Sequence, residues 1–171
     1  MEHMPNYVLR YGLIGGTISI ALGLINWFTI AQSYGPKVSQ TTGYLTVILS
    51  LMCVPLGIRY FRDKLNGGTI SFSKGFRIGL GITTIFSLIT FLYSALFFVF
   101  AGDTFDQWTK KGLSKTELIE MQHRLEETPD FALTPWFQAF ILFLTVFLIG
   151  VVINLVSCLL LKRSETDSVL K

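Results

Sequence analysis

Residues 75–100 read GFRIGLGITTIFSLITFLYSALFFVF and dominate the architecture of the chain. Arg77 is the only charged residue among them. At 1.5 Å per residue, a helix of this length crosses the ~30 Å hydrocarbon core of a bilayer. A lone strand would leave its backbone groups unpaired in lipid, so the segment is predicted to be a membrane-spanning helix.

Three further apolar runs have similar lengths and lie at about residues 11–31, 42–61 and 134–161. Of the 171 residues, 51% are hydrophobic and 15% are charged, whereas soluble domains carry about 25% charged residues. Four spans leave no room for a separate catalytic domain. We therefore predict an all-α fold, an integral membrane four-helix bundle in which residues 1–171 form a single transmembrane domain.

The first two connections are short and carry turn signals. Residues 32–40 contain Gly35 followed by proline, so the first two spans should form an antiparallel hairpin. The Asn-Gly-Gly sequence at 66–68 supplies positions that tolerate positive φ after the second span. Ser71 is placed to N-cap the third helix.

The third connection contains a predicted short extramembrane helix at about residues 115–127. Ser114 and Glu117 have the spacing of a capping box, and Pro129 marks the end of the helix. Its apolar positions recur on one face, so we expect it to lie on the outer membrane surface or to cap the bundle.

The positive-inside rule predicts that both termini are cytoplasmic. Nine Lys and Arg residues lie in the N-terminal segment, the second connection and the tail, against five on the opposite side. With this orientation Trp27, Trp108 and Trp136 gather near the outer interface, where aromatic belts form.

The second connection holds the densest group of cations, and Asp63 is the only acid in it. This group, called the basic cluster below, consists of Arg59, Arg62, Lys64, Lys74 and Arg77. Such a cluster ordinarily fixes orientation, and a specific contact with anionic lipid is the functional alternative.

The spans lack the residues that catalysis or ion-coupled transport use. No Asp, Glu, Lys, Arg or His lies in the central part of any span. Cys53 and Cys158 have no His or second Cys at metal-ligand spacing, and no pair of titratable groups suits acid–base or nucleophilic chemistry. The net charge of +3 is too small to suggest nucleic-acid binding. We predict no enzyme activity, no cofactor, no metal site and no nucleic-acid partner.

Small residues recur at helical spacing in two spans, a pattern typical of close helix packing. They are Gly12, Gly16, Ser19 and Gly23 in the first span, and Gly75, Gly79, Thr83 and Ser87 in the third. Asn26 and Asn154 are the most polar side chains in the spans, and each is expected to find an interhelical partner. Packing inside one bundle is the ordinary interpretation. The alternatives are a homodimer face for the small residues and a ligand role for the asparagines.

The first and third spans also resemble one another. Arg10-x-Gly12-Leu13 matches Arg77-x-Gly79-Leu80 at a constant offset. A duplicated two-helix unit would explain the match and would give parallel repeats related by an axis along the membrane normal.

Several segments also carry a family resemblance. They are Tyr11-Gly12-Leu13-Ile14, Arg59-Tyr60-Phe61-Arg62-Asp63, Gly112-Leu113-Ser114 and, most specifically, the run 66–79 that starts with Asn-Gly-Gly. These segments resemble the four-span bacterial membrane proteins, mostly from Bacteroidetes, that form domain-of-unknown-function family 4199. The resemblance implies an inner-membrane location. It implies no activity, catalytic residue or cofactor.

We therefore expect a non-enzymatic, multi-pass inner-membrane protein that acts by helix packing. Its expected partner is the lipid bilayer, a second copy of the chain or another membrane protein. The alternative is a small transporter or channel whose path lies between the two repeats, lined by Asn26, Asn154 and the hydroxyl groups of the third span.

Overall fold

The computed structural model describes residues 6–111 and 113–163, which form an all-α fold, as predicted. The elements in chain order are α1 (Asn6–Ile25), η1 (Asn26–Ile30), α2 (Ala31–Leu51), α3 (Cys53–Tyr60), η2 (Phe61–Leu65), α4 (Phe72–Lys110), α5 (Lys115–Glu127), η3 (Asp130–Leu133) and α6 (Pro135–Leu161). Gly112 of the family segments, and the terminal residues of the predicted domain, lie outside the described residues.

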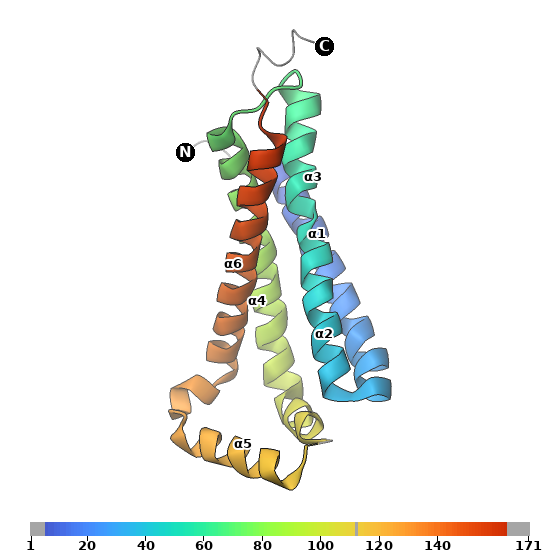
Figure 1. The fold of residues 1–171 in the computed structure, drawn as a ribbon, viewed down its shortest axis with the longest axis vertical. Coiled ribbons are helices and arrows are strands. Elements are labelled where there is room, and N and C mark those ends of the chain that lie inside the picture. The colour runs from blue at the N-terminus through green and yellow to red at the C-terminus, as the bar shows by residue number, and fades with distance from the viewer. Residues whose placement is uncertain (1–5, 112, 164–171) are drawn as a thin grey trace.

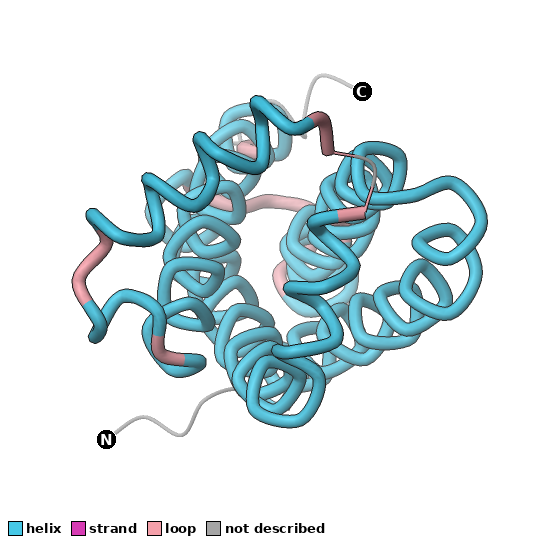
Figure 2. The backbone as a smooth tube through the Cα atoms, turned by 90° about the horizontal axis from the view of Figure 1, so that it is seen from below, coloured by secondary structure: helices cyan, strands magenta, loops and turns pink. Residues whose placement is uncertain are grey.

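Four long helical segments lie side by side, and α5 crosses one end of the molecule (Figure 1). The segments are α1 with η1, α2 with α3 and η2, α4, and α6. The view along the molecule shows them nearly end-on (Figure 2). The helices α1 and α4 run in the same direction, as the proposed repeat requires (Figure 1).

The first reversal takes place at one residue. Helix continues to Tyr34, and Gly35 then adopts φ 78° and ψ −174°, a backbone that glycine reaches without steric cost. Pro36 opens the return helix, where its missing N–H is not needed. Within the predicted connection over residues 32–40, the chain reverses at the Gly-Pro pair alone. The predicted hairpin is confirmed, since Asn26 on one arm donates a 3.0 Å hydrogen bond to Ser39 on the other.

The second reversal follows the sequence prediction closely. Gly67 and Gly68 have φ of 61° and 85°, and Asn66 Nδ2 donates to the Thr69 carbonyl oxygen at 2.7 Å. Ser71 then caps α4 by accepting a hydrogen bond from the Lys74 N–H, as predicted.

The chain after α6 returns to this loop. Ile70 and Arg163 exchange two backbone hydrogen bonds of 3.0 Å each, which forms an antiparallel bridge. Both ends of the described chain therefore lie at the same end of the bundle (Figure 1). No local pattern in the sequence predicted this pairing.

The helix α4 has 39 residues and is about 58 Å long, well beyond the thickness of a hydrocarbon core. The span predicted over residues 75–100 lies within α4, which continues through the more polar residues 101–110, where no proline occurs, to Lys110. The residues of the last predicted span, 134–161, coincide with α6, which is capped by Thr134 and runs to Leu161.

The short helix α5 is confirmed with its capping box. Ser114 Oγ accepts from the Glu117 N–H at 3.3 Å, and the Ser114 N–H donates to Glu117 Oε2 at 2.8 Å. No α5 residue is buried, so the helix depends on its own caps more than on packing.

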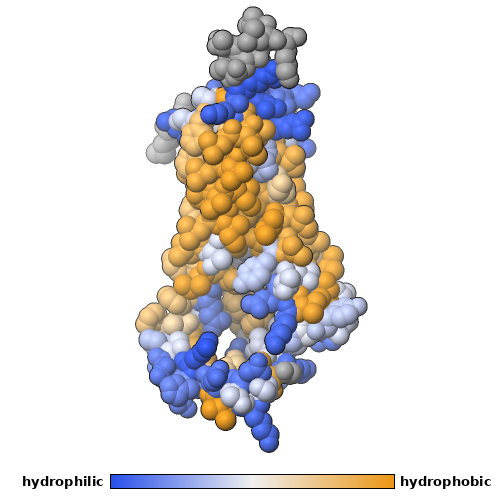
Figure 3. Space-filling model, in the orientation of Figure 1, coloured by the Kyte–Doolittle hydropathy of each residue, from blue (hydrophilic) through white to orange (hydrophobic). Residues whose placement is uncertain are grey.

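An apolar band covers the face shown in Figure 3, and hydrophilic side chains lie above and below it. Exposed aliphatic residues occur on α2, α4 and α6, among them Leu45, Leu49, Leu92, Leu96, Leu148 and Val152. Soluble monomers rarely expose so large a contiguous apolar surface.

Within the described residues, three helices are long and apolar enough to cross a membrane: Asn6–Leu65, Phe72–Lys110 and Pro135–Leu161. The first has 60 residues and contains the reversal at Gly35, so it consists of two antiparallel arms.

Replacing Gly35 with Ala should destabilise the hairpin by about 1–2 kcal/mol, because a residue with a Cβ is strained in the left-handed region. Among the described residues no heavy atom lies within 4 Å of the added Cβ, so the effect comes from the backbone alone. The measurement is the thermal unfolding midpoint of the purified protein in detergent, which should fall.

Gly43→Ala is the matched control on the same helix, because its Cβ would meet Asn26 Nδ2 at an ordinary 3.9 Å. This control should keep or raise the midpoint. An unchanged midpoint for Gly35→Ala would show that the residue does not need its positive φ.

Candidate functional site

The helices α4 and α6 approach closely where a glycine on each faces a larger side chain on the other. Asn154 of α6 is fully buried, and its Nδ2 donates to the Phe76 carbonyl oxygen of α4 at 3.0 Å. A Cβ on Gly79 would overlap the Asn154 amide, 2.6 Å from its Cγ. In the reverse sense, a Cβ on Gly150 would lie 2.5 Å from Thr83 Cγ2. The predicted interhelical partner of Asn154 is thus the backbone of α4.

The small residues predicted on α4 all lie inside the chain's own bundle. Gly75, Gly79, Thr83 and Ser87 are buried. A Cβ on Gly75 would lie 3.3 Å from Cys158 Sγ of α6. Because this stripe is already covered within one chain, it is not a surface on which a second copy can dock. The homodimer alternative therefore has no free face here.

The small residues predicted on α1 face α4. A Cβ on Gly12 would lie 2.7 Å from Ile85, and one on Gly16 would lie 2.7 Å from Ile89. Ser19 is also buried, whereas Gly23 is partly exposed beside Tyr93. The glycines therefore let α1 approach α4 as closely as α6 does on the other side.

The residues predicted to line a transport path lie in different environments. Thr83, Ser87 and Asn154 each have 0% exposure, between packed helices. Asn26 lies elsewhere, on η1, where its side chain bonds to Ser39.

The basic cluster lies at the end of the bundle that also holds both described chain ends. Arg62 contacts Asp63 at 2.6 Å and donates to the Leu161 carbonyl oxygen at 3.4 Å. Lys74 Nζ donates to Asn66 Oδ1 at 3.2 Å and lies 4.8 Å from the centre of the Phe61 ring. These two members of the cluster hold the loop and the end of α6 in place.

The remaining cations of the cluster, Arg59, Lys64 and Arg77, are exposed, as is Lys74. Arg59 makes a 3.4 Å contact with Asp63. The hydrogen bond from Arg62 holds the pKa of the Asp63 carboxyl below its ordinary value, with further contributions from the charges of Arg62 and Arg59. The carboxylate therefore stays ionised and offsets part of the cluster's charge at neutral pH.

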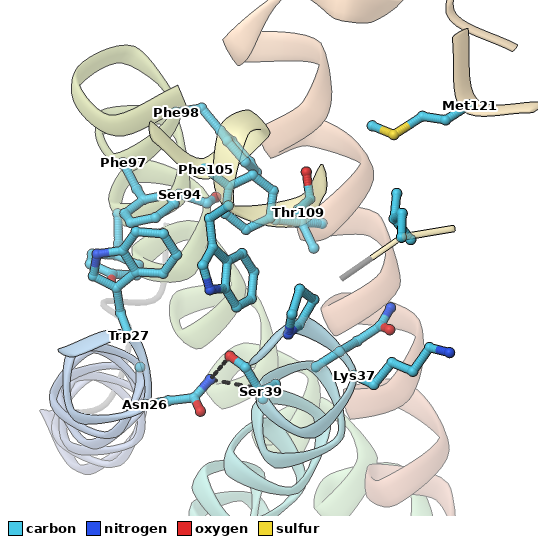
Figure 4. A pocket seen from close by; sticks show the side chains of 18 residues that line it. Asn26, Trp27, Lys37, Ser39, Ser94, Phe97, Phe98, Phe105, Thr109 and Met121 are labelled. Atoms are coloured by element: carbon cyan, nitrogen blue, oxygen red, sulfur yellow. Dashed lines mark hydrogen bonds between the residues drawn. The ribbon is translucent and has the colours of Figure 1, made fainter. Parts of the chain in front are cut away.

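A cavity of about 640 Å³ lies at the opposite end, between η1, the start of α2, the second half of α4 and α5. The ring of Trp27 lies 5.2 Å from Phe97 and 5.3 Å from Trp108, measured between centroids. Trp108 is buried and donates from Nε1 to the Ala31 carbonyl oxygen at 3.0 Å. Trp27 and Phe97 lie on one side of the cavity and Lys37 on the other (Figure 4).

Trp27 and Trp108 were predicted to lie near the outer membrane interface, but the sequence did not predict the cavity between their helices. The aromatic residues of 97–108, spaced along one helix, were the available signal. Trp136 lies apart from the pair, with its ring 6.5 Å from Phe91.

Within the described part of the chain, no three His, Cys, Asp or Glu side chains are grouped closely enough to hold a metal ion. Cys53 and Cys158 are buried free thiols. The short helix carries one His–carboxylate contact, in which His123 Nδ1 lies 3.4 Å from Glu127 Oε1, and both side chains are about 70% exposed.

The length and hydropathy of the helices define the class as multi-pass helical membrane proteins. The chain belongs to the family described as "Protein of unknown function (DUF4199)", whose model matches residues 10–163. The family resemblance seen in the sequence is thus confirmed. No curated protein and no solved structure shows a significant match to the chain.

Gly79→Ala should lower the free energy of unfolding by about 1–3 kcal/mol, because the new Cβ must displace the buried Asn154 amide. The measurement is unfolding by titration with SDS in mixed micelles. Adding Asn154→Ala should recover part of the loss, because the clash is then removed.

Gly102→Ala is the control on the same helix. Among the described residues no heavy atom lies within 4 Å of its added Cβ, so alanine there should be neutral or stabilising by about 0.5–1 kcal/mol. If both substitutions had the same effect, the contact between α4 and α6 would not depend on the small residue.

Proposed function

We propose that the protein is a four-span integral protein of the bacterial inner membrane, with both termini in the cytoplasm. It acts by helix packing and by contact with lipid or a membrane partner, and it does not catalyse a reaction. The family and the three long apolar helices support this proposal at the level of class.

The distribution of cations is the observation that carries the orientation. The basic cluster lies in and beside the loop between η2 and α4, at the end of the bundle where both ends of the described chain lie (Figure 1). Hydrophilic side chains gather at this end beyond the apolar band (Figure 3). Cytoplasmic loops are enriched in Lys and Arg, whereas acids contribute little to orientation. The opposite side has five Lys and Arg residues, against nine on the side of the cluster and the termini.

The members of the cluster that bond neither to the loop nor to the end of α6 are the ones placed to meet lipid. Arg59, Lys64 and Arg77 are exposed at the ends of two neighbouring segments, and Arg59 also contacts Asp63. Arg62 is partly buried and bonds to the end of α6, and the exposed Lys74 donates to Asn66. Each exposed cation near an anionic leaflet contributes roughly 1 kcal/mol. The three together favour the cytoplasmic placement of this end.

Replacing Arg59, Lys64 and Arg77 together with Gln should give a mixed topology. Arg62 and Lys74 are retained, so the fold of the loop is kept. A reporter fused after Lys171, active only in the cytoplasm in one version and only outside it in another, measures the two orientations.

The control removes Lys110, Lys111 and Lys115 at the opposite end and should leave the reporter cytoplasmic. If the reporter stayed wholly cytoplasmic after loss of Arg59, Lys64 and Arg77, these charges would not be the orienting signal. Their role would then be a specific contact with lipid or protein.

A further inference from the structure

The aromatic cavity has a second hollow beside it. The second hollow, of about 430 Å³, shares Pro36, Lys37, Trp108 and Leu113 with the first. We call the first the apolar chamber and the second the cationic vestibule. The rings of the apolar chamber come from Trp27, Tyr93, Phe97, Phe98, Phe105 and Trp108. The vestibule adds a second lysine, Lys111, and the polar side chain of Gln32.

Three of the polar side chains that line the apolar chamber donate hydrogen bonds within the protein. Asn26 donates to Ser39, Ser94 donates to the Thr90 carbonyl oxygen at 2.8 Å, and Thr109 Oγ1 donates to the backbone at 2.9 Å. An apolar occupant would leave these three hydrogen bonds in place, so it would not strip these donors of their partners. Among the described residues, the buried Asn26 Oδ1 has no hydrogen-bond partner.

The vestibule carries two cations from different elements. Lys37 comes from the start of α2 and Lys111 caps α4, and both are exposed. Glu117 lies close enough to Lys37 for the charge of the lysine to act on its carboxylate. Its pKa is lowered mainly by the Ser114 backbone hydrogen bond and to a smaller extent by the charge of Lys37. Among the described residues no ion pair within 4 Å joins Glu117 to Lys37, so the ammonium group can still bind an anion.

The size of the apolar chamber limits the occupant. Its volume of about 640 Å³ falls in the usual range of about 300–1,000 Å³ for small-molecule sites. A cavity of this volume is suited to one acyl chain and not to a whole two-chain lipid. The π-helical segment η1 presents both Asn26 and Trp27 to the chamber, and such segments often occur at functional sites.

From this arrangement we propose that the two chambers bind a single apolar chain with an anionic head, as in a fatty acid. The chain lies among the rings around Trp27 and Trp108, and the head binds Lys37 and Lys111. One chain of an anionic phospholipid from the bilayer offers the same chemistry, so the experiment below includes an arm that separates the two sources.

The test uses the full chain in phosphatidylcholine nanodiscs. Trp136→Phe removes the tryptophan that lies away from the cavity, so that Trp27 and Trp108 report alone. The probe is a dibrominated fatty acid, whose bromine atoms quench tryptophan fluorescence on contact. Its methyl ester has the same chain without the charge and is the matched probe.

The fatty acid should quench with saturation, and the ester should bind more weakly. Lys37→Gln and Lys111→Gln should each raise the half-saturation concentration about fivefold. Lys115→Gln removes an exposed lysine that lines neither chamber and should have no effect. Quenching without saturation, equal quenching by acid and ester, or unchanged titrations of the Lys37 and Lys111 variants would overturn the proposal.

A further arm replaces part of the phosphatidylcholine with phosphatidylglycerol. An unchanged half-saturation assigns the site to a free fatty acid, and a rise assigns it to a chain of the anionic bilayer lipid. The quenching does not depend on which way the protein lies in the membrane. Failure of this proposal is therefore distinct from failure of the proposed topology.

Discussion

The bundle depends on the contact between α4 and α6, in which each helix offers a glycine to a larger side chain of the other. Gly79 makes room for Asn154, and Gly150 makes room for Thr83. Lipid chains are as apolar as leucine, so association in a bilayer relies on close van der Waals packing and interhelical hydrogen bonds. Asn154 provides both, because its amide fills the space over Gly79 and donates to the Phe76 carbonyl.

This contact makes α4 the central helix, with α6 on one side and α1 on the other. The glycines of α1 face Ile85 and Ile89 of α4, but the small residues end near Gly23, where Tyr93 is the neighbour. Beyond this point the facing residues are aromatic, such as Trp27 and Phe97. Rings keep the helices further apart than glycines do, which explains why the packed half of the bundle gives way to a cavity.

The two ends of the molecule are consequently built in different ways. At one end, the Ile70–Arg163 bridge and the bonds of Arg62 and Lys74 tie the loop to the end of α6. At the other end, α5 is fixed by its capping box and has no buried residue. The first end is suited to holding topology, and the second leaves a hollow with two lysines at its edge.

The sequence by itself determined the helical class, the apolar spans and the local signals of Gly35, Ser71 and Ser114, because these depend on length, backbone conformation and hydrogen bonds between near neighbours. It also marked Gly79 and Asn154 as packing residues, but not that they meet. Only the tertiary structure decided that pair, the Ile70–Arg163 bridge and the cavity between Trp27 and Trp108, since hydropathy reports which residues prefer lipid and not which helix faces which. The length of α4, to Lys110, also came from the structure, because polar residues end a span but do not by themselves end a helix.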